Sequence, residues 1–427
     1  MFSRPRHNDV TSQKPGPNCY CCEVIEEPSV KVGDVVELAT ERMSYGGDAV
    51  ARYHGLAVFI PLAAPGETLR VRIVERKKNF ARATIEEILV PRSSRRKAPC
   101  QHFGECGGCQ LQHMDYETQL EAKAGFVRDA LLRIGKVEWP HQIMVRPSPE
   151  FGYRIRAQVK VERSSTEAFK IGFTRAASHS VCDLVSCPIL SPRLESSLHQ
   201  LRGYLNERAE ELDTLLQGRR LAEVELAEGS SGVAVTPNQG PWPEGELTLK
   251  VRGATYTYSP DTFFQVNRFL LDELVQEAVT GEDGCLALDL YAGVGLFAIQ
   301  LASKFEKVVA VESATRAASY ARRNAVRNGL SNVEVHESMV ETFLRQMIES
   351  NPDLVLLDPP RSGAYEAINL LAQLRARRIT YVSCDPTTLA RDIKPLVASQ
   401  YSLERVVAFD LFPQTYHVET VVSLRLK

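Results

Sequence analysis

The stretch at residues 286–295 reads LALDLYAGVG, an apolar run that ends in an aspartate, a tyrosine and two closely spaced glycines. Such a run predicts a buried strand that turns tightly into a helix and leaves its backbone open to a ligand. Helical patterns fill most of the intervals between this run and six similar ones, which lie at residues 307–312, 332–338, 353–360, 378–386, 405–412 and 420–426. The alternation of the two patterns predicts an α/β fold, a mostly parallel sheet with helices on both faces.

The last two predicted strands are separated by the segment PQTYHVE at residues 413–419, which has no room for a crossover helix. These strands must therefore pair antiparallel, because neighbouring parallel strands need a connection of a dozen or more residues. We expect a sheet of seven strands, ending in an antiparallel hairpin, over residues 256–427. This pattern resembles the Rossmann-like fold of methyltransferases.

The part of the chain before this sheet has a different pattern. Residues 30–90 carry short alternating runs separated by turn signals such as Gly46-Gly47, which predicts a small OB-like β-barrel rather than a βαβ unit. The region that follows mixes helix-like and strand-like runs, which indicates an α+β arrangement. The expected organisation is a mobile tail at 1–28, a barrel at 29–92, a central domain at 93–255 and the sheet domain at 256–427.

Composition excludes several classes of protein. With 427 residues, 44% of them hydrophobic, the chain is long enough for three folded domains and too apolar for wholesale disorder. It has no run of 18 uncharged apolar residues and no apolar core of a signal peptide at its start, so we expect a cytoplasmic protein without membrane contact. The net charge of −2 hides a local surplus, because residues 70–97 hold ten basic and three acidic side chains. This segment predicts an RNA-binding face on the barrel, and an ordinary solvated surface is the alternative.

Open α/β sheets bind their ligands beyond the carboxyl ends of the parallel strands, so residues at those ends are candidate site residues. Glu312 ends the second strand, where a carboxylate can accept hydrogen bonds from both hydroxyls of a ribose. The third glycine of a dinucleotide fingerprint is missing after Gly293 and Gly295. The sequence therefore favours S-adenosylmethionine over NAD as the cofactor.

Two further residues at this edge predict covalent catalysis. Cys384 follows the fifth strand in the motif SCDP, where Asp385 and Pro386 indicate a loop, so we interpret it as a nucleophile rather than a buried core cysteine. The hairpin brings Glu419 to the same edge, where it can act as a general base; an exposed glutamate opening an edge strand is the alternative. Arg361 follows Asp-Pro-Pro where an aromatic residue would suggest methylation of an exocyclic amine, so that reaction is disfavoured.

Three cysteines within ten residues form a metal-binding pattern, Cys100-x5-Cys106-Gly-Gly-Cys109. Zinc sites usually use paired Cys-x2-Cys elements, whereas three cysteines with a distant fourth are more typical of an iron–sulfur cluster. The spacing also departs from that of radical enzymes that use S-adenosylmethionine. Cys182 and Cys187 are the candidates for the fourth ligand, and we favour Cys187 because a proline follows it.

The motifs together resemble those of the RNA 5-methyluridine methyltransferases, over nearly the whole chain from about residue 30. The resemblance rests on the cysteine pattern followed by x-Leu-Gln, on FFQVN at 263–267, and on DLYAGVG, DPPRSG, SCDP and a terminal HVE at 417–419. It implies that the barrel is an RNA-binding TRAM domain. It also implies a 4Fe–4S cluster held by Cys100, Cys106, Cys109 and Cys187, and cofactor contacts from Gln265, Tyr291, Glu312 and Asp358. Leu296 departs from the family pattern, in which several members have asparagine, so one contact to the cofactor's amino-acid end is in doubt.

The reaction that the resemblance implies is methylation of uridine at carbon 5. The Cys384 thiolate adds to carbon 6 of uracil, carbon 5 attacks the methyl group, and Glu419 removes the proton from carbon 5. The target base must leave its stack, so we expect a loop or an opened helix as the substrate. Arg154 and Arg156 are candidate RNA contacts, with a surface salt-bridge role as the alternative.

We expect the substrate to be 23S ribosomal RNA and the protein to act as a monomer. Transfer RNA is the alternative substrate, because the barrel and the cluster motif indicate RNA without identifying it. Ribosomal RNA is favoured since transfer-RNA members of the family often lack both features. A non-catalytic RNA-binding protein with a vestigial methyltransferase fold is the other alternative, and the complete set of candidate site residues argues against it.

Overall fold

The computed structural model describes residues 30–427 except for 165–168, 238, 239, 241, 243, 244, 282 and 349. The expected tail at 1–28, with its three cysteines, lies outside the described residues. Among those described, no helix is long and apolar enough to cross a membrane.

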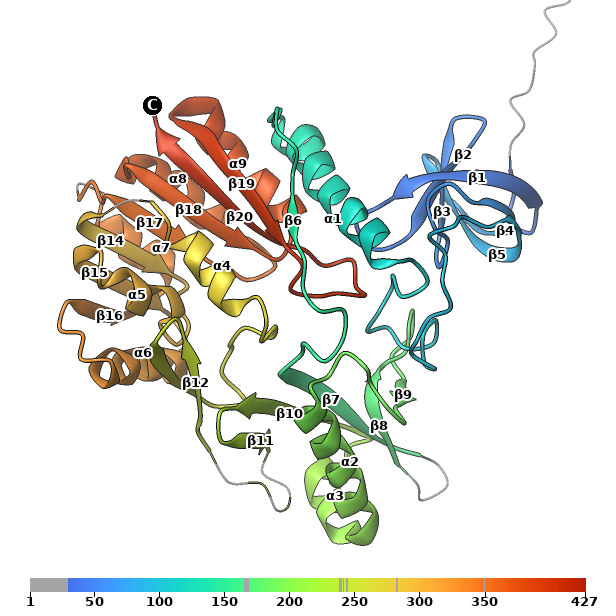
Figure 1. The fold of residues 1–427 in the computed structure, drawn as a ribbon, viewed down its shortest axis with the longest axis horizontal. Helices are drawn as coiled ribbons and strands as arrows, with labels where there is room; N and C mark the ends of the chain where they lie inside the picture. Colours follow the sequence, from blue (N-terminus) through green and yellow to red (C-terminus); the bar gives the residue numbers. More distant parts are fainter. Residues whose placement is uncertain are drawn as a thin grey trace, which may run out of the picture.

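The amino-terminal strands close into a five-stranded barrel in the order β1-β2-β3-β5-β4 (Figure 1). Its strands are β1 (Val35–Met43), β2 (Ala49–Tyr53), β3 (Leu56–Ile60), β4 (Thr68–Arg76) and β5 (Phe80–Val90). Alternate residues of β1 and β4 point into the apolar core, as the period of a strand requires. The expected barrel is confirmed.

Many barrel arginines face carboxylates of the same barrel. Arg70 pairs with Glu37 and Glu87, and Arg72 pairs with Glu86. Arg82, Arg95 and Lys77 are paired in the same way. The surplus of basic residues counted between positions 70 and 97 is therefore smaller on the folded surface than in the sequence, because partners from outside that segment, such as Glu37, Asp48 and Glu67, neutralise part of it.

The carboxyl-terminal sheet has the order β16-β15-β14-β17-β18-β20-β19-β6. Its parallel core consists of β14 (Gly284–Leu290), β15 (Phe305–Glu312), β16 (Val333–Glu337), β17 (Leu354–Leu357) and β18 (Arg378–Ser383). The last strand, β20 (Glu419–Leu426), is antiparallel to both β18 and β19 (Tyr401–Phe409). The hairpin at the end of the chain, expected from a connection too short for a helix, is thus present, with β20 inserted between its neighbours.

An eighth strand joins this sheet from a distant part of the sequence. β6 (Val145–Arg146) pairs parallel with β19, and it follows α1 (Tyr116–Ala130) and a π-helical turn (Leu131–Gly135). Val127 and Leu131 are buried in the same core as the sheet strands. Figure 1 shows α1 between the barrel and the red hairpin strands. Seven strands were expected, because a two-residue strand carries no periodicity that a sequence pattern can reveal.

Helices cover both faces of the sheet, and they are α4 (Leu271–Ala278), α5 (Leu296–Leu301), α6 (Thr315–Arg327), α7 (Val340–Gln346), α8 (Tyr365–Leu374) and α9 (Pro386–Ser399). The remaining elements build a five-stranded antiparallel sheet and a small hairpin. They are β7 (Arg156–Arg163), β8 (Phe169–Thr174), β9 (Val181–Asp183), α2 (Pro192–Glu207), α3 (Ala209–Leu216), β10 (Leu221–Gly229), β11 (Gly232–Thr236), β12 (Leu247–Val251) and β13 (Ala254–Tyr258). This central sheet carries its own apolar core beneath α2 and α3.

Candidate active site

The two predicted catalytic residues face each other across an antiparallel strand pair. Ser383, the last residue of β18, pairs with Thr420 of β20. Continuing this register by one residue sets Cys384 opposite Glu419, because antiparallel partners move in opposite directions along the two chains. The Glu419 side chain is buried, and Cys384 is partly buried.

The electrostatics of this pair favour the protonated forms. Burial, and next the charge of Glu419, raise the pKa of Cys384 to about 12. Burial and the nearby Asp358 raise the pKa of Glu419 well above its usual range. Arg361 opposes both shifts, since its positive charge favours the thiolate and the carboxylate. Arg361 is therefore a component of the site that the sequence reading did not assign, although it lies in the motif DPPRSG.

The motif SCDP has a local structural explanation. The Asp385 carboxylate caps α9 by accepting hydrogen bonds from the backbone N–H groups of Thr387 (2.7 Å) and Thr388 (3.2 Å). Pro386 occupies the first helical position, where its missing N–H costs nothing. Cys384 is thus the residue between the end of a buried strand and a capped helix, which gives it a well-defined backbone position.

The loop that carries Arg361 is held by a buried aspartate. Asp392 of α9 accepts hydrogen bonds from the Ala364 backbone N–H at 2.7 Å and from the Tyr381 hydroxyl at 2.8 Å. Gly363 adopts a φ of +81°, and a Cβ there would lie 2.4 Å from an Asp392 oxygen. The glycine of DPPRSG is therefore required for the loop to pack against Asp392.

Three carboxylates converge at the ends of neighbouring strands on the cofactor side. Burial raises the pKa of Asp358 to about 7. Burial, together with the charges of Asp358 and Glu312, raises the pKa of Asp289 to about 8. One oxygen of Asp289 accepts a hydrogen bond from the Ala298 N–H, and the other is buried without a partner among the described residues. A cluster of this kind fits a ligand that carries positive charge, as the sulfonium and ammonium groups of S-adenosylmethionine do.

The predicted cofactor residues lie around this cluster. Gln265 donates from its side-chain amide to Asp358 at 3.4 Å. Glu312 accepts hydrogen bonds from the backbone N–H groups of Gly293 (2.9 Å) and Ala314 (2.7 Å), which hold the glycine turn against the end of β15. Tyr291 begins that turn with a φ of +60°. Its hydroxyl donates to a carboxylate oxygen of Glu341 at 3.2 Å.

Four of the five central cysteines line one cavity. Cys100, Cys106, Cys109 and Cys187 face it together with the apolar side chains of Phe103, Phe173, Leu184 and Ile189. Burial and neighbouring thiols raise the pKa of Cys109 to about 11 and that of Cys187 to about 12. A set of clustered thiols in an apolar setting fits an iron–sulfur cluster or a metal ion, because bound metal stabilises thiolates that would otherwise repel one another.

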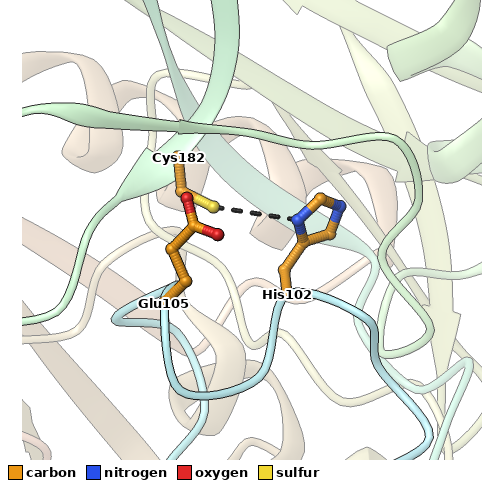
Figure 2. A group of neighbouring side chains, drawn as sticks. All are labelled: His102, Glu105 and Cys182. Atoms are coloured by element: carbon orange, nitrogen blue, oxygen red, sulfur yellow. Dashed lines mark hydrogen bonds between the residues drawn. The ribbon is translucent and has the colours of Figure 1, made fainter.

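Cys182 belongs to a different group, drawn in Figure 2 with His102 and Glu105. The Val185 backbone N–H donates to Nε2 of His102 at 3.0 Å, so the proton of the neutral ring is on Nδ1. That nitrogen faces the Cys182 sulfur at 3.9 Å, and Glu105 is paired with Arg175 at 2.6 Å. We therefore interpret this group as hydrogen-bonded rather than metal-binding.

The candidate RNA contact Arg156 has an internal role instead. Its guanidinium donates to the backbone carbonyls of Phe264 at 3.1 Å and Pro260 at 2.7 Å, which fixes the segment leading to Gln265. Arg154 also donates inward, to the carbonyl of Arg156 at 2.7 Å. Neither arginine makes the surface salt bridge considered as the alternative, as far as the described residues extend.

Comparison with known proteins gives consistent matches along the chain. Residues 196–427 match the family model for tRNA (uracil-5-)-methyltransferase, and residues 29–85 match the TRAM domain. An uncharacterised RNA methyltransferase of Aquifex aeolicus is 32% identical, covering 92% of this chain and 99% of its own length. A 23S rRNA (uracil(1939)-C(5))-methyltransferase of Salmonella typhi is 34% identical, covering 92% and 96% of the two chains.

A solved structure matches nearly the whole molecule. The Pyrococcus abyssi tRNA (uracil-54, C5)-methyltransferase, in complex with S-adenosyl-L-homocysteine, is 25% identical with a TM-score of 0.70. The match covers 91% of this chain and 100% of the other. The chain therefore belongs to the tRNA (uracil-5-)-methyltransferase family and is an S-adenosylmethionine-dependent RNA uracil-5-methyltransferase with a TRAM domain.

Proposed function

We propose that this enzyme methylates carbon 5 of a uridine in 23S ribosomal RNA through a covalent adduct with Cys384. The observation that carries the mechanism is the register of β18 and β20, which sets Cys384 opposite the buried Glu419. A nucleophile and a proton acceptor that are cross-strand neighbours match the two bonds that the reaction must change on adjacent ring carbons.

The chemical steps balance with these two side chains. The Cys384 thiolate forms a bond to carbon 6 of uracil, and the electron pair of the carbon 5–carbon 6 double bond moves into an enolate. S-adenosylmethionine, when bound, would supply an electrophilic methyl group; carbon 5 of the enolate would form the bond to this methyl group while the methyl–sulfur bond breaks, leaving its electron pair on the sulfur of S-adenosylhomocysteine. Glu419 then takes the proton from carbon 5, and the electrons of that C–H bond restore the double bond as the thiolate leaves. The thiolate and the free carboxylate are the required forms, so Arg361, which favours both, supports the reaction.

We propose that Gln265, Tyr291, Glu312 and Asp358 hold the cofactor, with Asp289 as an additional acidic neighbour. Glu312 would receive the ribose hydroxyls at the end of β15. The buried carboxylate of Asp289 and the partly buried one of Asp358 would face the positively charged part, which would offset the burial and the carboxylate repulsion that raise the pKa of Asp289. Leu296 is buried and offers its backbone carbonyl to the Tyr256 hydroxyl at 3.0 Å, so its side chain supplies no polar contact.

We propose that Cys100, Cys106, Cys109 and Cys187 hold a 4Fe–4S cluster. The shared cavity supports this set, and Cys182, which turns toward His102, is left outside it. Four thiolates would occupy all four irons, so the cluster's role here is structural. Elemental analysis of the purified protein, together with its visible absorbance, distinguishes iron–sulfur from zinc.

The choice of ribosomal RNA as the substrate rests on sequence identity to relatives named for 23S rRNA, and not on the presence of the barrel and the cysteine region. The expectation that transfer-RNA members often lack the barrel and the cluster region does not discriminate here, because the archaeal tRNA enzyme matches 91% of this chain. Relatives named for 23S rRNA reach 31–34% identity over 88–92% of the chain, above the 25% of the tRNA enzyme. The test is to map 5-methyluridine in both RNAs with and without this protein; a mark lost only from transfer RNA would contradict the proposal.

Two variants test the covalent mechanism. Cys384→Ala should abolish methyl transfer, since the ring is then not activated at carbon 5. Glu419→Gln should accumulate a protein–RNA adduct that survives denaturation, because carbon 5 has been methylated but its proton cannot leave. Full activity of the first variant, or absence of any adduct in the second, would contradict the proposed roles.

A further inference from the structure

The turn between β1 and β2 of the barrel docks against the catalytic region. The backbone N–H and the hydroxyl of Ser44 both donate to the Asp48 carbonyl at 2.8 Å, which closes the turn. Gly46 and Gly47 adopt φ values of +117° and +93°. A Cβ on Gly47 would lie 2.7 Å from the Cβ of Gln110, which follows the cysteine motif. This turn is therefore shaped for close contact with the rest of the enzyme rather than for solvent.

Tyr45 at the tip of this turn reaches the site itself. Its hydroxyl lies 3.5 Å from the backbone carbonyl oxygen of Cys384. Its ring packs edge-on against Tyr416 of the β19–β20 turn, with centroids 5.3 Å apart, and against Phe126 of α1 at 5.9 Å. Burial, and then the charge of Asp385, raise the pKa of the tyrosine, so its hydroxyl stays protonated and remains a donor.

Cys384 is the single residue between the end of β18 at Ser383 and the cap of α9 at Asp385. Ser383 and Asp385 fix its two ends through hydrogen bonds between the Ser383 hydroxyl and the Asp385 backbone. The Cys384 carbonyl between them receives the tyrosine hydroxyl from the barrel side. Reacting atoms must be held within a fraction of an ångström, and small misplacements lower rates strongly.

We propose that Tyr45 is a positioning residue for methyl transfer: from the barrel, its hydroxyl and ring hold the Cys384 peptide and the Tyr416 turn so that thiol and carboxylate face each other. This inference rests on the proposed nucleophile. It assigns the TRAM domain a second role in this enzyme, as one wall of the catalytic site in addition to a surface for RNA. An RNA-only role would place Tyr45 on the exposed barrel face, whereas its ring is enclosed by two other elements.

The test uses the full-length enzyme, with the RNA that the wild type methylates, under single-turnover conditions. Tyr45→Phe removes only the hydroxyl, and we expect the single-turnover rate to fall about three- to tenfold while the KM for RNA is unchanged, as the loss of one weak hydrogen bond predicts. Tyr45→Ala also removes the ring contacts and should lower the rate further. Tyr53→Phe, a hydroxyl deletion in β2 of the same barrel, is the matched control and should keep the wild-type rate.

The outcomes separate this inference from the proposed mechanism. A wild-type single-turnover rate in Tyr45→Phe, or a change in KM alone, would overturn the positioning role and leave an RNA contact. Adduct formation on RNA that contains 5-fluorouridine, which blocks proton removal, provides the second readout: Tyr45→Phe should slow the appearance of adduct by the same factor. If Cys384→Ala, run in parallel, still transfers methyl groups, it is the covalent mechanism that fails.

Discussion

At the residue scale, the raised pKa values of Cys384 and Glu419, the proposed catalytic pair, predict the pH dependence of the enzyme. Because the pKa of Cys384 is raised to about 12, only a small fraction of the enzyme molecules carry a Cys384 thiolate near neutral pH. This fraction increases tenfold for each pH unit below the pKa, and Glu419 also loses its proton as the pH rises. We therefore expect the single-turnover rate to rise with pH between about 7 and 9. A rate that does not change with pH over this range would show that bound RNA and cofactor already keep Cys384 as a thiolate and Glu419 as a carboxylate.

Substitution of Arg361 tests whether the protonation of the Cys384 thiol limits the rate. It favours the thiolate of Cys384, and it makes no ion pair within the part of the chain that the structure describes. Arg361→Gln should raise the thiol pKa further, shift the pH–rate profile to higher pH, and lower the rate at neutral pH by about tenfold for each unit by which the thiol pKa rises. Arg361→Lys keeps the charge and should retain most of the rate. An equal loss of rate in Arg361→Gln and Arg361→Lys would mean that the geometry of the guanidinium or its contact with RNA matters, rather than its charge.

Sequence reasoning found the residues at strand ends and missed those that depend on distant packing. Cys384 and Glu419 were expected at one edge of the sheet, because a parallel strand and a following hairpin bring their ends together and Asp385 and Pro386 indicate a loop. The register of β18 and β20 agrees with this placement, and the catalytic roles of the two residues are proposals. Asp289 is part of the motif DLYAGVG, but the motif does not show its function. Its burial near Asp358 and Glu312 is what suggests that it faces a positively charged ligand. The sequence indicates Tyr45 only as an aromatic residue of the barrel turn, and its contact with the Cys384 peptide leaves no local pattern, since 339 residues separate the two.

At the scale of elements, α1 and the β19–β20 turn are held together by a buried ion pair. Lys123 of α1 donates to Asp410 at 2.5 Å and to the Phe412 carbonyl at 3.0 Å, and both charged side chains are fully buried. A second contact is the Gln414 carbonyl, which accepts hydrogen bonds from the backbone N–H groups of Gln110 and Leu111. The turn that precedes Glu419 is therefore fixed by elements that come much earlier in the chain.

Removing one partner of this pair should be more harmful than removing both. Lys123→Met leaves the Asp410 carboxylate buried without its cation, and we expect a loss of about 3–5 kcal/mol in the free energy of unfolding. Lys123→Met combined with Asp410→Leu leaves no buried charge and should recover much of that loss. Denaturant unfolding of the two single variants and the double variant measures the coupling. If the loss of unfolding free energy in the double variant equals the sum of the losses in the two single variants, Lys123 and Asp410 have no interaction energy with each other.

The elements that the sequence did not predict share a physical reason. β6 has two residues, and β2 is flanked by turns on both sides, so neither presents a clear alternation. β12 and β13 form a short hairpin whose place is decided by packing on α6 and β10 rather than by local preference. The long periodic elements, by contrast, follow the apolar pattern closely, because each must bury one face or both.

At the scale of the whole molecule, charge counting along the sequence overstated the basic surface of the barrel. Ion pairs with carboxylates of the same barrel absorb much of it, among them those of Arg70, Arg72 and Arg82. Surface pairs of this kind contribute little to stability, but they reduce the potential available to attract phosphates. The barrel meets the rest of the enzyme where its β1–β2 turn contacts α1 and the segment after the cysteine motif, through the ring contact of Tyr45 with Phe126 and the close approach of Gly47 to Gln110.

That meeting place predicts how the cysteine cavity affects the enzyme as a whole. Gln110 and Leu111, directly after Cys109, hold the Gln414 carbonyl at 3.0 and 2.9 Å. Cys187→Ser should therefore lose iron and visible absorbance, and should also speed hydrogen exchange at the amides of Gln110 and Leu111, because the anchored segment loosens. Cys182→Ser, a matched substitution at the cysteine that faces His102, should keep iron and exchange as in the wild type.

The reverse result, with iron lost in Cys182→Ser and retained in Cys187→Ser, would show that Cys182 and not Cys187 is the fourth ligand. Loss of iron in Cys187→Ser without faster exchange would instead show that the cysteine segment is held by its contacts to the central sheet, such as the Gly107 N–H to the Thr174 carbonyl at 2.9 Å. In the expected case, loss of the cluster lowers methyl transfer through the position of Glu419, since the hairpin turn that precedes this residue would have lost one of its anchors, the contact of Gln110 and Leu111 with the Gln414 carbonyl.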